Sequence, residues 1–173
     1  KHLYNIHFSF LPKYKGMYTS AWPILNNERY TGVTLHKIDQ GIDTGNIIDQ
    51  IKLRIKTTDC ARDLYYKYMK SGCLLFKKNF ENLVNNNFTS VRQNILDSSY
   101  YSKNSINFKK ISINLHKTAY EISKEIRAYS FKEYQLPRLF GKKIVNHEIL
   151  KKKSKSKPGS IINDNYKSIT IAT

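Results

Sequence analysis

Cysteine is scarce in this sequence, with only two among 173 residues. Cys60 and Cys73 form no CxxC pair and have no nearby histidine-ligand pattern, which argues against a zinc site. Both fall in a stretch that we expect to be helical, where we interpret them as reduced packing residues of a cytosolic protein. We therefore expect no metal centre.

Acidic residues are also few: 13 Asp and Glu stand against 30 Lys and Arg, for a formal net charge of +17. This charge indicates anionic partners, whether nucleic acid, phosphorylated metabolites or acidic cofactors. A bias toward Lys, Asn, Ile and Tyr would raise the charge without any partner, so both interpretations stay open. The block from Lys151 to Lys157 holds five lysines and no acid, which is typical of a solvated linker or loop.

Long apolar runs are absent, and none approaches the roughly 20 residues of a membrane span. The opening "KHLYNIHF" lacks the regions of a signal peptide, so we expect a cytoplasmic protein without membrane contact. It also lacks an initiator Met and runs straight into a strand pattern, so we expect a fragment or a chain whose start is absent. With 40% apolar residues, the chain is long enough for one domain with a proper core.

Apolar periodicity predicts a mixed α/β order: strand, short helix, two strands, long helix, second helix and a β-rich tail. The two middle strands are expected to pair because a short turn joins them. The tail is expected to end in a hairpin with "NDN" at its turn. The predicted ranges are 4–10, 20–27, 32–38 and 46–55, then helices over 61–83 and 114–128, and the hairpin over 159–173.

Three polar residues suggest chemistry. Asn5 and His7 lie two apart in a predicted strand, so their side chains share a face. His7 could act as a general base, since its unperturbed pKa is about 6.5, and Asn5 could donate to an oxyanion. Asp43, in a glycine-flanked turn, could orient His7. No strong nucleophile is among them, which favours direct transfer; the alternatives are a structural histidine and an Asx-turn aspartate.

The stretches "NIHFSFLPKYKG", "WPILN" and "TGVTLHKIDQGIDTGNII" resemble the formyltetrahydrofolate-dependent formyltransferase family. The family pattern is N-x-H-x-S-L-L-P, followed downstream by an Asp in an L-D-x-G turn. This sequence matches it with Phe10 in place of the usual Leu and with "IDTG" as the turn. The other matching positions are Asn5, His7, Ser9, Leu11, Pro12 and Asp43.

The resemblance implies an α/β fold with a partial doubly wound, formyltransferase-type Rossmann-like sheet and a small C-terminal β-rich region. Residues 1–110 would be the C-terminal half of the catalytic domain, with its N-terminal half absent. Residues 111–173 would hold a helix and the small β-rich region. Asn5 and His7 would then end a strand at the carboxyl edge of the sheet, where such folds place their sites.

The resemblance also implies a mechanism with N10-formyltetrahydrofolate as co-substrate and without a metal. The amine of the acceptor attacks the formyl carbon while His7 acts as general acid and base. Asn5, with His7 once protonated, stabilises the oxyanion, and Asp43 holds His7 and helps to relay protons. The residues expected on the folate side of the cleft are Ser9, Leu11, Pro12 and Thr44.

For the acceptor, "GMYTSAW", "YYSK" and "IRAYSFKEYQLPRLFGKKI" look most like the nucleotide-sugar N-formyltransferases. That likeness implies a nucleotide-linked 4-amino sugar such as a dTDP-sugar, a homodimer and a place in lipopolysaccharide biosynthesis. Aromatic and basic residues could stack on a base and pair with a diphosphate, or else be helix-end packing and solvated charge. The candidates are Tyr101, Lys103, Arg127, Tyr129, Lys132 and Tyr134.

Two alternatives stay open. The lysine block and the tail after it resemble the linker and first strands of the β-barrel of methionyl-tRNA formyltransferase, and positive charge suits tRNA. The loop after Gly16 fits that enzyme poorly. A non-catalytic basic binding remnant is the other alternative, although the intact Asn5, His7 and Asp43 argue against decay of the site.

Overall fold

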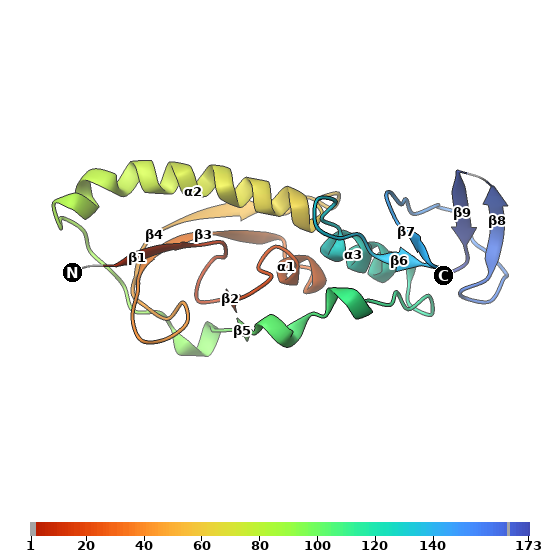
Figure 1. Ribbon diagram of the computed structural model, residues 1–173, viewed down its shortest axis with the longest axis horizontal. Helices are drawn as coiled ribbons and strands as arrows, with labels where there is room; N and C mark the ends of the chain where they lie inside the picture. The colour runs from red at the N-terminus through yellow and green to blue at the C-terminus, as the bar shows by residue number, and fades with distance from the viewer. Residues whose placement is uncertain (1–2, 166) are drawn as a thin grey trace.

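The computed structural model describes residues 3–165 and 167–173 (Figure 1). Three short 3-10 helices, Ile95–Asp97, Lys103–Ser105 and Phe108–Lys110, supplement the longer elements. The main elements are β1 Tyr4–His7, β2 Lys15–Gly16, α1 Trp22–Leu25, β3 Tyr30–Lys37, β4 Ile47–Arg54, α2 Ala61–Val84, β5 Tyr100–Tyr101, α3 Ala119–Tyr129, β6 Arg138–Leu139, β7 Lys142–Lys143, β8 Ile161–Asn165 and β9 Ser168–Ile171.

Strands β1, β3 and β4, which all lie between Tyr4 and Arg54, form a three-stranded antiparallel sheet in the order β1-β3-β4. β3 pairs with β4 as expected, and β1 lies on the other side of β3. β1 is therefore an edge strand within the part of the chain that the structure describes. A separate parallel pair joins β2 to β5 and so links the loop after β1 to the segment after α2. The mixed α/β class is confirmed.

The predicted strand over 4–10 ends early, at His7. Beyond it, the Thr34 hydroxyl donates to the Ser9 carbonyl (2.7 Å) and accepts from the Leu11 amide (3.1 Å). A side chain from β3 thus replaces the backbone partner that a longer strand would need. This contact turns the chain away from the sheet just after His7.

One face of the sheet is covered by α2, which lies along it in Figure 1. The face that α2 turns to the sheet is apolar at three-and-four spacing, and its buried side chains meet those of β3 in one core. The fully buried members of this contact are Leu64, Tyr68, Leu75, Val33 and Leu35. Cys60 precedes α2 and Cys73 lies on its exposed side; both are free, so Cys73 is not the packing residue we expected.

An apolar groove of about 700 Å³ lies between β1 and α2. Ile6 and Phe8 line it from the strand side, and Met69 and Phe76 line it from the helix. Met69 and Phe76 keep 44% and 46% of their surface exposed.

The C-terminal region begins with α3, which starts at Ala119 rather than at 114. Thr118 explains the difference, because its hydroxyl accepts from the Glu121 amide while the Glu121 carboxylate accepts from the Thr118 amide. The hairpins β6–β7 and β8–β9 follow. The predicted turn residues 163–165 lie in β8 instead, where Asn165 pairs with Ser168 of β9.

The lysine block over 151–157 is exposed, as expected of a solvated loop. In Figure 1 the β8–β9 hairpin lies at the end of the molecule opposite β1. None of the helices in the described residues is long and apolar enough to cross a bilayer.

Candidate active site

The pairing of β1 with β3 determines which side chains lie next to one another in the site. Asn5 lies opposite His36 and His7 lies opposite Thr34 in the antiparallel register. Because Asn5 and His7 are two apart, their side chains project from the same face, and the register brings His36 beside them. His36 is 2% exposed and was missed by the sequence analysis. Its alternation with Thr34 in a strand adjoining β1 was the signal that could have found it.

The turn between β3 and β4 delivers Asp43. Its backbone has a φ of +54°, in the left-handed region that aspartate tolerates. The Asp39 carboxylate folds the turn by accepting from the Gly41 amide (3.1 Å) and the Thr44 hydroxyl (2.6 Å). Gly45 is required there, because a Cβ would collide with the Lys37 carbonyl. The turn therefore bends back over the sheet and points Asp43 toward β1.

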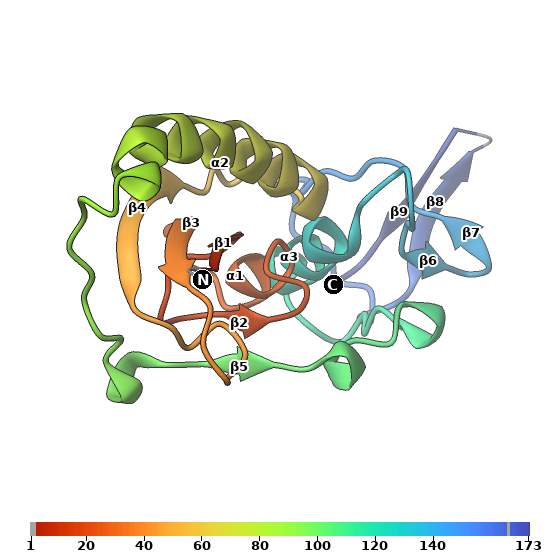
Figure 2. The same ribbon diagram turned by 60° about the vertical axis from the view of Figure 1, so that its left-hand side comes forward.

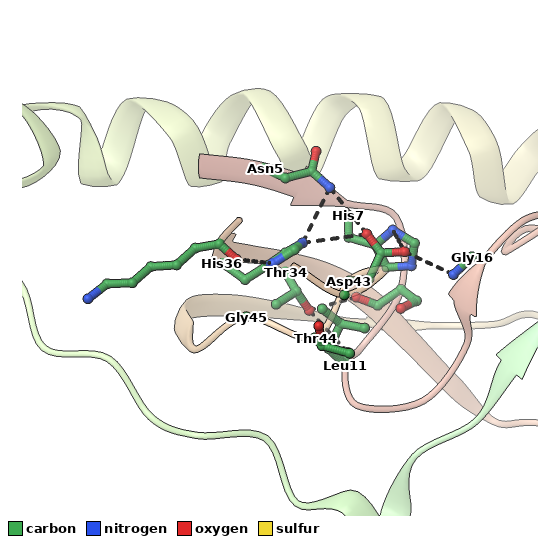
Figure 3. A network of polar contacts seen from close by, with 12 residues as sticks. Asn5, His7, Leu11, Gly16, Thr34, His36, Asp43, Thr44 and Gly45 are labelled. Carbon is green, nitrogen blue, oxygen red and sulfur yellow. Dashed lines mark hydrogen bonds and ion pairs between the residues drawn. The ribbon is translucent and has the colours of Figure 1, made fainter. Parts of the chain in front are cut away.

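Asp43 contacts both of the residues with which the sequence analysis grouped it (Figure 3). Its Oδ2 lies 3.5 Å from His7 Nδ1 and accepts a hydrogen bond from the Gly16 amide at 2.9 Å. Its Oδ1 accepts from Asn5 Nδ2 at 3.4 Å and lies 3.7 Å from His36 Nε2. Asn5, His7 and Asp43 are thus brought together as predicted, with His36 and Gly16 as additional neighbours.

Two backbone carbonyls determine which nitrogen of each neutral imidazole carries the proton. The Tyr14 carbonyl lies 2.8 Å from His7 Nε2, so Nε2 carries the proton and Nδ1 of the neutral ring faces Asp43. The Lys37 carbonyl lies 2.8 Å from His36 Nδ1, which leaves His36 Nε2 as an acceptor for the Asn5 amide at 3.3 Å. The two histidines therefore adopt opposite tautomers when neutral.

The pKa of His7 is lowered from its ordinary value, mainly because burial penalises the charged ring. The Tyr14 carbonyl and the Asp43 carboxylate act in the opposite direction, and His36 adds a smaller lowering contribution. His7 is consequently a neutral base at neutral pH, next to a carboxylate that can stabilise its protonated form. That pairing suits a group that accepts a proton briefly and returns it.

Comparison with known proteins shows which family the sequence around this site resembles. Residues 1–77 match the family model described as formyl transferase. Residues 1–77 belong to the formyl transferase family. The chain is 30% identical to methionyl-tRNA formyltransferase of Alkaliphilus oremlandii, over 98% of this chain and 54% of the relative. It therefore spans about half the length of the curated relatives that it matches.

Two solved structures share the fold of this chain with TM-scores of 0.78. One is the N-formyltransferase from Helicobacter canadensis in complex with folinic acid and dTDP-3-aminofucose, 55% identical over 82% of this chain and 52% of that one. The other is WlaRD, a sugar 3N-formyl transferase solved with dTDP and 5-N-formyl-THF, 54% identical over 82% of this chain and 51% of that one. The described sheet and helices are thus part of a formyltransferase fold.

The residues predicted on the folate side are of two kinds, buried and accessible. Ser9 and Leu11 are buried, and the Ser9 hydroxyl donates to the Lys13 carbonyl at 2.8 Å. They support the loop after β1. Pro12 is half-buried and Thr44 is exposed, so these two keep surface for a ligand. Contact of the four with folate stays a prediction.

Of the residues predicted to bind the acceptor sugar, Tyr101 contacts the loop that follows β1. Its ring stacks on Trp22 with 4.0 Å between centroids and on Tyr14 with 5.8 Å, and its hydroxyl accepts from Asn26 at 3.2 Å. The Lys103 side chain is exposed, and its carbonyl accepts from the Tyr18 hydroxyl. The pairing of β2 with β5 is what brings Tyr101 to this loop.

The other four predicted residues lie at the end of α3 and just after it. Arg127 donates to the Asp59 carbonyl at 2.9 Å, and the Tyr129 ring meets Phe108 edge-on at 6.4 Å. Lys132 and Tyr134 are exposed. Across the described residues, no hydrogen bond, ion pair or ring contact joins these four to the Asn5–His7–Asp43 cluster. Their role toward an acceptor stays a prediction.

Within residues 3–165 and 167–173, no three His, Cys, Asp or Glu side chains form a group that could hold a metal ion. The site instead offers one imidazole base, a carboxylate and an amide. These groups can move a proton and stabilise negative charge on oxygen.

Proposed function

We propose that this chain supplies the catalytic residues of an enzyme that transfers a formyl group to the amine of a nucleotide-linked amino sugar. The observation that carries the proposal is the contact of one carboxylate, Asp43, with both His7 and Asn5. The family match and the two neighbours crystallised with reduced folates support formyl transfer. N10-formyltetrahydrofolate supplies the formyl group.

His7 is the proton carrier of the proposed reaction. Its Nδ1 accepts the proton that the acceptor amine loses on attack, while the Tyr14 carbonyl keeps the ring oriented through Nε2–H. The Asp43 carboxylate stabilises the imidazolium that forms. The same proton then passes to N10 as its bond to the formyl carbon breaks, which leaves tetrahydrofolate and the formamide and restores neutral His7.

Asn5 is the oxyanion donor of the proposed reaction. In the structure its amide protons go to Asp43 at 3.4 Å and His36 at 3.3 Å. Both distances are long for hydrogen bonds, so exchanging one of them for a developing oxyanion costs little. Asn5 can therefore stabilise negative charge that exists only during the transfer.

The acceptor that we propose to test first is a dTDP-linked 3-amino sugar. The neighbours at 55% and 54% identity are named for dTDP-3-aminofucose and for sugar 3N-formyl transfer. A 4-N formyltransferase from Francisella tularensis shares only 28% identity. This comparison favours a 3-amino sugar over the 4-amino sugar that we expected from the sequence. A homodimer, a cytoplasmic location and a role in lipopolysaccharide biosynthesis stay predictions.

Methionyl-tRNA is the second candidate acceptor. The methionyl-tRNA formyltransferase of Alkaliphilus oremlandii aligns with 98% of this chain, including the tail, whereas the two sugar enzymes with TM-scores of 0.78 cover 82%. The exposed lysine block at 151–157 offers positive charge for a nucleic-acid backbone. The non-catalytic remnant is a weaker candidate, because the buried polar cluster is complete.

The test is a formyl-transfer assay on the protein as it is encoded. N10-formyltetrahydrofolate is offered with a dTDP-linked 3-amino sugar, a 4-amino sugar and methionyl-tRNA in separate reactions. Turnover of the 3-amino sugar in preference to the others is expected. Turnover of methionyl-tRNA alone, falling steeply with salt, would favour the second candidate. Turnover of none would count against transfer and favour the remnant.

A further inference from the structure

Residues 91–101, which we call the crossing segment, run from the region after α2 to β5. Figure 2 shows this green stretch leaving α2, passing the sheet and reaching β2. At its start, Val91 exchanges two backbone hydrogen bonds of 2.8 Å with Ile47, the first residue of β4. At its end, β5 pairs with β2. The segment is therefore attached to β4 just after the Asp43 turn and to β2 in the loop after β1.

Gln93 is the contact of the crossing segment with the Asp43 turn. It is 6% exposed, and its Nε2 donates to the carbonyls of Asp43 and Gly45, each at 2.8 Å. Both protons of one amide thus hold two carbonyls on a turn whose central residue has a left-handed backbone. Loss of the amide would leave these carbonyls without their donor, which favours movement of the turn.

Ser99 is the contact of the crossing segment with the loop after β1. Its hydroxyl accepts from the Tyr14 amide at 2.8 Å, and its carbonyl accepts from the Lys15 amide at 2.9 Å. That loop touches both members of the proton-carrying pair: the Tyr14 carbonyl accepts from His7, and the Gly16 amide donates to Asp43. A shift of the loop would therefore reach His7 and Asp43 together.

We propose that Gln93 and Ser99 are positioning residues, through which the crossing segment holds Asp43 and His7 in contact. Gln93 acts on the backbone of the Asp43 turn, and Ser99 acts on the loop that orients the His7 ring. Neither side chain reaches the reacting atoms, so both work through other residues. The inference rests on the proposed function for its catalytic meaning, but its structural content can be measured without substrate.

The pKa of His7 reports the position of Asp43. His7 is faced by Asp43 from the β3–β4 turn, by His36 from β3 and by the Tyr14 carbonyl from the loop. Asp43 and the carbonyl raise the pKa, while burial and His36 lower it. If the turn moves away, a raising contribution is lost and the pKa of His7 falls further below its ordinary value.

The first test replaces Gln93 by Met, which keeps the length of the side chain and removes both donors. Its matched control is Asn79→Leu, because Asn79 is also a buried amide and donates to Asp49 and to the Leu75 carbonyl, away from the cluster. NMR titration of His7, thermal unfolding and formyl-transfer kinetics are measured on the protein as it is encoded.

In Gln93→Met we expect a lower pKa of His7 and a kcat reduced roughly 10- to 100-fold with a smaller change in KM, since small misplacements of catalytic groups have such effects. In Asn79→Leu we expect a lower Tm and an unchanged pKa of His7. If Gln93→Met lowers only the Tm, as Asn79→Leu does, and leaves the pKa of His7 and kcat unchanged, the proposal is overturned. If the wild type shows no transfer and the His7 shift is nevertheless found, the proposed function fails while the positioning role stands.

Ser99 provides the second test, which also decides the matter if Gln93→Met does not fold. Ser99→Ala removes the acceptor of the Tyr14 amide, whereas Ser99→Thr keeps a hydroxyl. We expect Ser99→Ala to shift the His7 titration and to lower kcat, and Ser99→Thr to restore both. Equal behaviour of the two variants would overturn the role assigned to Ser99.

Discussion

His7 and Asp43 meet with 3.5 Å between Nδ1 and Oδ2, although one ends β1 and the other lies in the turn after β3. Both side chains are largely buried. A carboxylate at this position favours the protonated ring, while burial favours the neutral ring. The balance between these two effects makes the pair suited to accept and return a proton, and it leads to four predictions.

Replacing His7 by Gln should reduce formyl transfer by roughly 10²- to 10⁴-fold, the usual contribution of a general acid–base group. Binding of folate and acceptor should change little, because the glutamine can still donate toward the Tyr14 carbonyl. Single-turnover kinetics and equilibrium binding separate the two effects. His116→Gln is the control, since His116 is exposed outside the cluster. Turnover of His7→Gln near that of the control would refute the assigned role.

Asp43→Asn should keep the shape of the turn and remove its charge. The pKa of His7 should fall, because Asp43 is one of the groups that raise it, and kcat should fall with it. Asp164→Asn is the matched control, since Asp164 is an exposed aspartate of β8, outside the cluster. NMR titration and kinetics of both variants provide the comparison. A His7 pKa that is equal in the two variants would contradict the proposed pairing.

The pH dependence should follow the neutral form of His7. Because burial holds the folded pKa below the ordinary value of 6.5, activity should persist below pH 6.5 before it declines. Between those two pKa values the unfolded chain binds a proton that the folded chain does not, so stability should fall as pH drops below 6.5. Well above pH 6.5, where the ring is neutral in both states, this residue should add nothing to the pH dependence of stability.

Profiles of kcat and of urea unfolding against pH test this prediction. The same unfolding series on His7→Gln isolates the contribution of His7 from that of His147, whose pKa is also lowered by burial. An acid limb of activity centred above pH 6.5 would be incompatible with the geometry described for His7.

His36→Leu should remove the acceptor that holds the Asn5 amide. We expect kcat to fall by roughly tenfold, equivalent to about 1.4 kcal/mol, because Asn5 loses its fixed orientation. The pKa of His7 should rise, since His36 is one of the groups that lower it. His36→Gln should recover part of the activity because it again offers an acceptor. Opposite pKa shifts in His36→Leu and Asp43→Asn would support the arrangement, and shifts of the same sign would count against it.

Local sequence signals predicted much of the fold. The apolar spacing over 61–83 predicted α2 to within a residue of its observed end at Val84. The turn signals around Asp43 predicted that β3 and β4 pair. The end of β1 was predicted three residues too late, because the contact that ends it comes from Thr34, on another strand.

The candidate site was predicted in part for a similar reason. Asn5 and His7 could be paired from their spacing, and Asp43 could be added from the glycine-flanked turn and the resemblance. Gln93 and the Tyr14 carbonyl could not be found in this way, because they contact the cluster only after distant segments pack together.

By itself, the sequence determined the residue types of the polar cluster and the order of the elements that carry them, because strand spacing, helix periodicity and turn chemistry act over a few residues. Only the tertiary structure decided which nitrogen of each imidazole carries the proton and what holds Asp43 in place. Those outcomes depend on backbone groups of Tyr14, Gly16 and Lys37 and on the Gln93 amide. Every residue has the same backbone groups, so their role arises from where the folded chain places them.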